Sequence, residues 1–561
     1  MNATRWYVSL VLLLVTFLFI QRDFDDAYNR PIIGDAKAYY AYLPALFIYQ
    51  DFTYSFVDEI EDTYYLKDGS LSKDFKVRQP NGTYVNKTFP GAALFYLPFF
   101  LVAMVLSWLT GLPVDGYSVL FQWSIVAAHL FYFLAALVIL DKFMALRGIA
   151  AKNRIASLLM VTLTTNVFFY MVYDHSVVHI FGFFGCSLLL FLTQKGKEQN
   201  SWKYVGYVGI VMAVMLLTRP TNAMMLFFVP LVYPLRELVP DLKREFGWRE
   251  FPFHLFAVAA IVLFLAPLLW KIQTGNWIVY SYGDEKLNLL QPNLMNFLFS
   301  YKKGWLLWSP ALILMLVGSL LWFMRRSRVS GFLFTGVLFS ITYVFSSWWI
   351  WTYGMGMGQR TMIDYYPVLV WGMAGFLALL SKKAKIGVFA MMAFLAVINM
   401  VQAFQIHRFI LVGGETTKET YWEHFLQLKT DPPKTIIPPD WSFVEEFWEK
   451  ERVLLNDENH FSKSIELNSL PENPAFEVQV NLGGQNRKSS AMIVMSDQNG
   501  GWYHAEYPAN FIYKTPRAVS YLFIPDKKLK LPVKCYIWNG DTSDEVLVEE
   551  LKVSVYSMSA K

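Results

Sequence analysis

Long apolar stretches separated by short polar connections fill most of the first 405 residues of the chain. Their lengths are those of helices that cross a bilayer or nearly cross it, since a spanning helix needs about 20 apolar residues. The pattern predicts spanning helices at residues 7–20, 117–140, 155–173, 178–193, 204–218, 221–235, 253–272, 305–323, 331–348, 363–380 and 386–404. The expected fold class is therefore a polytopic α-helical membrane protein with about eleven spans.

One more apolar stretch, residues 90–109, decides the orientation of all later segments. If it does not cross the membrane, the basic clusters between the later stretches share one side, which the positive-inside rule identifies as the cytoplasm. If it crosses, the same clusters are placed outside. We therefore predict that residues 89–113 form a re-entrant or interfacial hairpin that lines a cavity in the protein. The basic clusters are Lys142/Arg147/Lys152/Arg154, Lys195/Lys197/Lys203, Arg236/Lys243/Arg244/Arg249, Arg325/Arg326/Arg328 and Lys382/Lys383/Lys385.

The first apolar stretch has one cation before it, Arg5, and no small-residue cleavage site after it. An uncleaved anchor is expected, with a cleaved signal peptide as the alternative. With the N-terminus inside and an odd number of spans, everything after about residue 405 lies on the outer face. Residues 204–218 and 221–235 are short and meet at a proline turn, which is typical of half-helices that border a substrate cavity.

The sequence changes after residue 405 to a polar stretch and then to alternating β-branched and aromatic runs. Short alternating runs bounded by Gly, Asn and Asp are typical of antiparallel strands. The expected strands are Phe476–Leu482, Ser490–Ser496, Ala518–Ile524, Val533–Trp538 and Leu547–Tyr556. We divide the chain into a transmembrane catalytic domain (1–405) with its first outer loop at 21–116, a linker (406–434) and a C-terminal all-β sandwich of jelly-roll type (435–561).

Composition narrows the class of protein without changing this picture. Hydrophobic residues make up 55% of the 561 residues and aromatic residues 17%, which excludes a soluble protein whose charged side chains cover its surface. The net charge of +5 does not indicate nucleic-acid binding, because the basic residues stand in connections that orient the spans. Two cysteines, Cys186 and Cys535, are too few for a disulfide framework, and neither is expected to be catalytic.

An acidic residue, Asp35, stands just outside the membrane within the sequence Pro31-Ile32-Ile33-Gly34-Asp35-Ala36-Lys37-Ala38-Tyr39-Tyr40. A carboxylate beside the hydrocarbon boundary is partly desolvated, which makes it a better general base than one in open water. The alternative is a solvated loop aspartate. We predict that Asp35 is a catalytic base at the membrane surface.

Basic residues on the outer side near the membrane are few, and they are therefore informative. Arg219 and Arg360 stand in short outer connections. Lys302 and Lys303 stand at the end of a longer one, just before an apolar segment. Cations held at headgroup depth against the positive-inside bias suit a ligand that carries a phosphate and a lipid tail. The alternative is snorkelling of these side chains toward lipid headgroups.

The outer connection Tyr173-Asp174-His175-Ser176-Val177-Val178-His179 carries an acid and two histidines. We predict that Asp174 and His175 orient an acceptor hydroxyl or contact phosphate, with no cofactor. Histidines four residues apart share a helix face, so His175 and His179 could instead bind a divalent metal together with Asp174 and Asp35.

Together these residues resemble the GT-C superfamily of integral-membrane glycosyltransferases, in particular bacterial relatives of the protein O-mannosyltransferases and aminoarabinose transferases (glycosyltransferase family 39). The resemblance covers about residues 1–405. In that family an acidic motif in the first outer loop, commonly Asp-Glu followed by a Tyr, supplies the catalytic carboxylate; here Asp35 and Tyr39 match, and Ala36 stands where Glu is usual. Three segments resemble the basic turns of that family: Thr218-Arg219-Pro220, Ser300-Tyr301-Lys302-Lys303-Gly304-Trp305 and Gly358-Gln359-Arg360.

The resemblance implies transfer of a sugar from a polyprenyl-phosphate donor to a glycan, lipid or protein acceptor on the outer face of a bacterial inner membrane, with the C-terminal domain in the periplasm. Asp35 is expected to act as general base, with Asp174 also catalytic, while cations stabilise the departing phosphate. A single displacement with one base predicts inversion at the sugar carbon. The expected substrate-binding residues are Tyr39, Tyr40, His175, Arg219, Lys302, Lys303, Tyr353 and Arg360.

A transporter or flippase of lipid-linked sugars is the main alternative function. It predicts internal repeats and charges in the middle of spans. The sequence shows no obvious repeat, and the notable charges stand at one face of the membrane. These observations favour the transferase.

Overall fold

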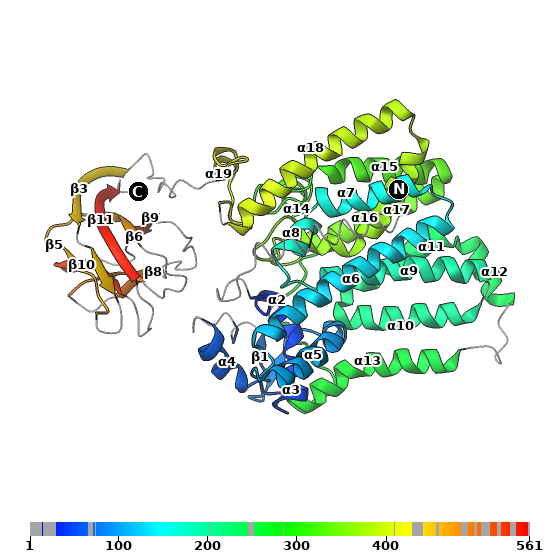
Figure 1. The fold of residues 1–561 in the computed structure, drawn as a ribbon, viewed down its shortest axis with the longest axis horizontal. Helices are drawn as coiled ribbons and strands as arrows, with labels where there is room; N and C mark the ends of the chain where they lie inside the picture. Colours follow the sequence, from blue (N-terminus) through cyan, green and yellow to red (C-terminus); the bar gives the residue numbers. More distant parts are fainter. Residues whose placement is uncertain are drawn as a thin grey trace. The chain divides into compact units, whose positions relative to one another are not determined.

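The computed structural model shows two compact units, one that extends to Leu428 and a second one whose description begins at Trp441 (Figure 1). The predicted anchor at residues 7–20 lies outside the described residues except at one position. The described residues are 14, 30–65, 71–72, 75–199, 201–244, 252–283, 285–408, 410–428, 441–450, 452–455, 459–483, 492–498, 502–505, 517–523, 525, 529–538 and 546–558.

The first unit is a bundle of helices with a folded polar loop at one end (Figure 1). Large aromatic side chains such as Trp308 and Trp371 fill its core. A two-stranded ribbon, β1 (Lys76–Arg78) and β2 (Tyr84–Asn86), belongs to the first loop. The helices are α2 (Gly34–Tyr40), α3 (Tyr42–Phe47), α4 (Phe56–Tyr64), α5 (Gly91–Thr110), α6 (Val119–Leu146), α7 (Ala151–Thr164), α8 (Val167–Val172), α9 (His179–Gln199), α10 (Trp202–Thr218), η2 (Pro220–Phe228), α11 (Val229–Val232), α12 (Leu235–Arg244), α13 (Phe253–Thr274), α14 (Leu294–Phe299), α15 (Ala311–Arg326), α16 (Arg328–Ser346), η3 (Arg360–Tyr365), α17 (Tyr366–Leu379), α18 (Lys382–His407) and α19 (Lys418–Glu423).

Six of the described helices are long and apolar enough to cross a membrane, or up to seven if the bent pair Pro220–Val232 and Leu235–Asp241 counts as one span. The six are α5, α6, α13, α16, α18 and the continuous pair η3–α17. This confirms a polytopic helical membrane protein. The finer count of eleven spans stays a prediction, because helices such as α7 and α10 are shorter than a full span.

The stretch predicted to form a hairpin is one continuous helix, α5, so the prediction of a hairpin is wrong. Its 20 residues include Pro98 but no polar turn that could reverse the chain. In an apolar environment the backbone N–H and C=O groups must be satisfied within the segment, which favours an unbroken helix over a hairpin.

The first residue of α5 and the loop that follows the helix both contact other elements of the first unit. A Cβ placed on Gly91 would lie 2.2 Å from the backbone nitrogen of Thr218, where α10 ends. Just beyond the other end, the carbonyl of Gly116 accepts a hydrogen bond from Tyr40 of α2. Between these contacts α5 packs alongside the first half of α6, where Phe95 contacts Tyr132 and Phe100 contacts Phe121. By length and composition α5 can span a membrane, so the orientation derived from the basic clusters stays a prediction.

The basic connections gather at the opposite end of the bundle. Arg147, after α6, donates hydrogen bonds to Gln194 of α9 and to the carbonyl of Val232. Arg326, at the end of α15, donates to the neighbouring carbonyl of Leu231. These contacts join connections that are far apart in the sequence, as the positive-inside pattern requires of clusters on one side.

The proline turn at residues 218–220 breaks the helix as predicted. Arg219 has an extended backbone (φ −156°, ψ 124°), and the 3-10 helix η2 begins at Pro220. Proline has no N–H to continue the hydrogen-bond ladder of α10. The break lets the side chain of Arg219 leave the axis of α10 where the helix ends.

Residues 410–428, within the predicted linker 406–434, pack on the first unit. Tyr421 of α19 is buried, its ring contacts that of Trp308, and its hydroxyl accepts a hydrogen bond from Gln402. The first compact unit therefore extends beyond the predicted boundary at residue 405.

The second unit is an all-β domain with two antiparallel sheets around one core. Val478 and Val553 reach this core from one sheet, and Ile493 and Cys535 reach it from the other. The sheets are ordered β5-β10-β7-β8 and β3-β11-β6-β9, with β4 paired to β11. A C-terminal all-β domain is thus confirmed, and the jelly-roll type stays a prediction. The strands are β3 (Trp441–Glu449), β4 (Val453–Leu455), β5 (Ile465–Leu467), β6 (Pro474–Gly483), β7 (Met492–Ser496), β8 (Trp502–Ala505), β9 (Arg517–Phe523), β10 (Val533–Trp538) and β11 (Val546–Met558).

Candidate functional site

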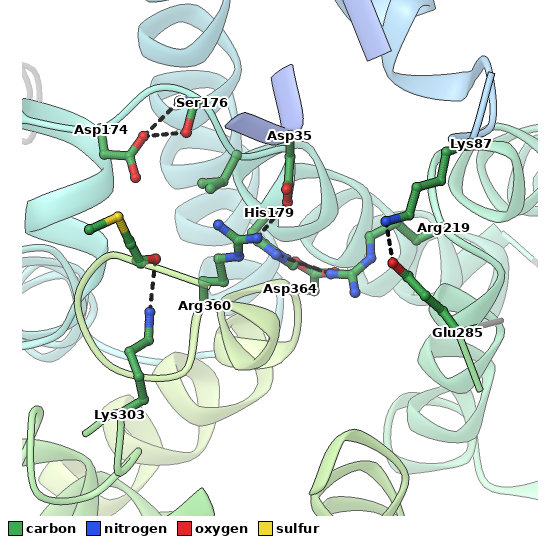
Figure 2. A network of polar contacts seen from close by, with 12 residues as sticks. Asp35, Lys87, Asp174, Ser176, His179, Arg219, Glu285, Lys303, Arg360 and Asp364 are labelled. Carbon is green, nitrogen blue, oxygen red and sulfur yellow. Dashed lines mark hydrogen bonds and ion pairs between the residues drawn. The ribbon is translucent and has the colours of Figure 1, made fainter. Parts of the chain in front are cut away.

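A group of charged side chains lies where the first loop meets the ends of α9, α10 and η3 (Figure 2). Asp35, in the first turn of α2, forms an ion pair with Arg360, with 2.7 Å between Oδ2 and Nη2. The side chain of Asp35 keeps 41% of its surface exposed, whereas that of Arg360 keeps 13%. The carboxylate is therefore accessible from outside while a mostly buried cation holds it in place.

The backbone before Asp35 places α2 against the connection that precedes α9. Gly34 has a φ of +54°, and a Cβ there would lie 3.1 Å from the hydroxyl oxygen of Ser176. That hydroxyl donates a hydrogen bond of 2.6 Å to Asp174. The two carboxylates predicted to be catalytic thus lie on neighbouring segments, and Arg360 interacts electrostatically with both of them.

Arg219 joins the group through a chain of polar contacts (Figure 2). Its Nη1 lies 2.9 Å from Nδ1 and 3.0 Å from Nε2 of His179, the first residue of α9. Nδ1 of His179 lies 2.8 Å from Oδ1 of Asp364, one turn after Arg360 in η3. The side chains of His179 and Asp364 are almost completely buried. Arg219 and Arg360 also interact electrostatically, so the two guanidinium groups lie near each other.

Lys303 adds a third cation to this region. It is buried, and its ammonium group donates a hydrogen bond of 3.1 Å to the carbonyl of Met355. Burial, reinforced by the charge of Arg360, lowers the pKa of Lys303 well below its usual value, while Asp174 and Asp35 act in the opposite direction. Such a lysine loses its proton readily, and a bound anion favours its return.

Tyrosine side chains surround the charged groups. Tyr39 is buried and interacts electrostatically with Asp35 and with both arginines. Tyr353 interacts with both arginines and donates its hydroxyl hydrogen to the carbonyl of Phe345. Tyr282, from the loop after α13, also faces Arg219. The structure therefore brings two predicted aromatic residues, Tyr39 and Tyr353, to the ion pairs.

Three residues predicted to bind substrate do not join the ion pairs. Tyr40 points to the opposite side of α2, where its hydroxyl donates to Gly116, because successive residues of a helix face different directions. Lys302 is exposed, whereas the next residue is buried. His175 is buried with its ring packed on that of His129.

The residues of the alternative metal set are engaged separately. His179 contacts Asp364, whereas His175 packs on a histidine of α6 and Asp35 pairs with an arginine. Across the described ranges, no group of three or more His, Cys, Asp or Glu side chains is arranged to hold a metal ion. The group therefore combines three cations, Arg219, Arg360 and Lys303, with the carboxylates of Asp35, Asp174 and Asp364.

Asp364 and Tyr282 are residues of this group that the sequence analysis does not predict. Asp364 falls in the apolar stretch predicted to span at residues 363–380. A charge inside a spanning segment is by default a candidate functional residue, and this signal identifies it. The ion pair between Lys87 and Glu285, which joins the first loop to the loop after α13, has no comparable signal.

No protein-family model matches the chain, and no curated protein matches its sequence. Among solved structures, the chain is similar to the crystal structure of the Archaeoglobus fulgidus oligosaccharyltransferase in complex with Zn and sulfate, with 13% sequence identity and a TM-score of 0.34. The similarity covers 77% of this chain and 58% of that chain. At this extent of similarity, the activity has to be argued from the charged group itself.

Proposed function

We propose that the chain is a membrane glycosyltransferase that moves a sugar from a polyprenyl-phosphate donor to an acceptor hydroxyl on the outer face of the membrane. The single observation that carries this proposal is the ion pair between the accessible Asp35 and the mostly buried Arg360 at the end of the bundle. Sugar transfer of this kind needs a base for the acceptor and positive charge for the departing phosphate. Arg219 and Lys303 supply the further charge.

Donor binding changes the partner of Arg360 in this proposal. The phosphodiester of the donor carries one negative charge, like a carboxylate, and its two unesterified oxygens accept two hydrogen bonds from one guanidinium group, so it takes the place of Asp35 at Arg360. A free carboxylate is a better base than one paired with a cation. The base is therefore released only when the donor is in place.

The transfer is then a single displacement. Asp35 takes the proton of the acceptor hydroxyl while the hydroxyl oxygen forms a bond to the anomeric carbon. The bond between that carbon and the phosphate oxygen breaks, and the lipid phosphate leaves with the electron pair, stabilised by Arg219, Arg360 and Lys303. Attack opposite to the leaving group inverts the sugar carbon. Asp174 supports the step by favouring the charged form of Lys303.

The substitution Asp35→Asn tests this proposal. We expect turnover to fall by about 10²- to 10⁴-fold, the usual contribution of a general base. Binding of the donor persists or becomes tighter, because the amide no longer competes with phosphate for Arg360. Asp58→Asn is the matched control, since Asp58 belongs to the same loop and its side chain is 73% exposed. Normal turnover of the Asp35→Asn variant contradicts the assignment of the base.

A flippase is distinguished by what it produces. Purified protein in detergent has no second leaflet, so a transferase still yields the glycosylated acceptor while a flippase yields nothing new. Mass spectrometry of the acceptor and anomer analysis of the product decide between the two functions and test inversion. Movement of a labelled lipid-linked sugar across vesicles without any product in detergent supports the flippase.

A further inference from the structure

The carboxylate of Asp364 has no part in the displacement described above, yet it lies inside the charged group. One oxygen, Oδ1, contacts His179, and the other, Oδ2, has no hydrogen-bond partner in the part of the chain that the structure describes. A buried carboxylate is costly unless a nearby opposite charge offsets the loss of hydration. The cation that interacts electrostatically with Asp364 is Arg219.

His179 connects these two charges in a defined way (Figure 2). Nη1 of Arg219 lies 2.9 Å from Nδ1 and 3.0 Å from Nε2 of the imidazole, so the guanidinium group contacts both ring nitrogens. Nδ1 also lies 2.8 Å from Oδ1 of Asp364. The ring of His179 is therefore in contact with both the carboxylate and the arginine.

Helix α9 contains a glycine that makes this contact possible. Gly182 follows His179 by three residues and lies on the same helix face. A Cβ on Gly182 would lie 2.4 Å from Cγ of Asp364 and within 2.8 Å of both carboxylate oxygens. The carboxylate of Asp364 therefore rests directly on the backbone of α9. Any larger side chain at this position pushes it away from His179.

We propose that Asp364 is a positioning residue that acts through His179 to aim Arg219 at the phosphate of the donor, and that Gly182 provides the space for it. The inference rests on the proposed function and deepens it. Each arginine then has its own carboxylate: Asp35 pairs with Arg360 and is displaced by phosphate, whereas Asp364 stays with Arg219. The second pairing keeps Arg219 in place through the whole reaction.

Binding of undecaprenyl phosphate to the full-length protein in detergent tests this inference without any transfer step. We expect Asp364→Asn to weaken binding by about tenfold, the size of one impaired charge-assisted hydrogen bond. In an Arg219→Gln background the same substitution has little further effect, because the residue it acts through is gone. Equal losses in both backgrounds, or binding like that of the unmodified protein, overturn the proposal.

Two glycines of α9 form a matched pair that separates positioning from packing. Gly182→Ala presses on Asp364, whereas Gly185→Ala, one turn later, presses on the flexible side chain of Met215. We expect both to change the melting temperature in detergent, but only Gly182→Ala to weaken undecaprenyl phosphate binding. Equal binding by the two variants overturns the role of Gly182. If the Gly182→Ala variant does not fold, the double-mutant measurement above still decides.

The readout also separates this inference from the proposed function. Lipid phosphate binding that depends on Asp364 can hold even if no transfer product is found, and in that case only the transferase proposal fails. If product formation depends on Asp35 but the Asp364→Asn variant binds undecaprenyl phosphate normally, only the positioning role of Asp364 is contradicted.

Discussion

At the scale of single residues, the site is organised by which cation each carboxylate contacts. Asp35 meets Arg360 at the accessible edge, and Asp364 meets Arg219 through a histidine in the interior. An accessible ion pair is exchanged easily, whereas a buried one is costly to break. The two pairs therefore suit different tasks, release of a base and lasting orientation of a cation.

Replacement of Arg360 by lysine tests the exchange of partners. Lysine keeps the charge but lacks the planar fork that binds phosphate with two hydrogen bonds. We expect the KM for the donor to rise about tenfold with a smaller change in kcat, measured by steady-state transfer at varied donor concentration. Arg78→Lys, at an exposed arginine of β1, is the control and leaves both constants unchanged. An unchanged KM for the Arg360→Lys variant argues against phosphate binding by Arg360.

The lowered pKa of Lys303 predicts a pH dependence of donor binding. The ammonium form is present below this pKa and is lost as the pH rises through it, because burial and Arg360 disfavour the charge. Donor phosphate binds the charged form, so the KM for the donor rises on the alkaline side. Lys303→Arg stays charged and shifts this rise to higher pH. Lys302→Arg is the control, because Lys302 is exposed and its substitution is expected to leave the pH profile of KM unchanged. A pH profile that is the same for the Lys303→Arg variant and the unmodified protein contradicts the prediction.

The residues that the sequence predicts best are those that stand against a general trend. Arg219, Arg360 and Lys303 are cations on the side where cations are predicted to be rare, and Asp35 follows the first apolar stretch. Their partners are set by tertiary contacts between residues up to 325 positions apart in the sequence, as for the ion pair of Arg360. Such pairings leave no pattern along the chain. The prediction for Tyr40 is wrong for a simpler reason, since neighbouring residues of a helix point in different directions.

At the scale of elements, apolar periodicity finds helices and strands but says little about their ends and contacts. Strand β3 escapes prediction because Glu445 and Glu446 interrupt the alternation of its aromatic residues. The register to β11 shifts at this place, which accommodates the irregular pattern. In α5 the same limitation appears differently, since its composition cannot distinguish a helix that crosses the membrane from one that does not.

Cysteine labelling tests the placement of α5. The two native cysteines are buried, so a single introduced thiol reports its own exposure. We expect Tyr84→Cys before α5 and Val114→Cys after it to react with a membrane-impermeant maleimide from the same side of sealed vesicles. Ala150→Cys, in the basic connection after α6, is the control that reacts only from the opposite side. Labelling of Tyr84→Cys and Val114→Cys from opposite sides shows instead that α5 crosses the membrane.

At the scale of the whole molecule, the charged group and the all-β fold belong to different units of the chain. All residues of the charged group belong to the first unit, and the second unit has a core of its own. A bundle with its basic connections at one end and its exchangeable ion pair at the other has a built-in direction across the membrane. The all-β unit contributes no residue to the reaction as proposed.

Two truncations test this division at its structural boundary. A chain that ends at Leu428 keeps α19 on the first unit, and we expect it to bind undecaprenyl phosphate and to transfer sugar to a small free acceptor within about twofold of the full chain. A chain that ends at Arg408 also loses Tyr421, which covers the ring of Trp308 and bonds to Gln402. Its melting temperature in detergent falls by several degrees, because burying one large aromatic side chain contributes a few kcal/mol. If the chain that ends at Leu428 folds and binds undecaprenyl phosphate but does not transfer sugar, the bundle alone is not sufficient for transfer. That result gives the β unit a role in the reaction itself.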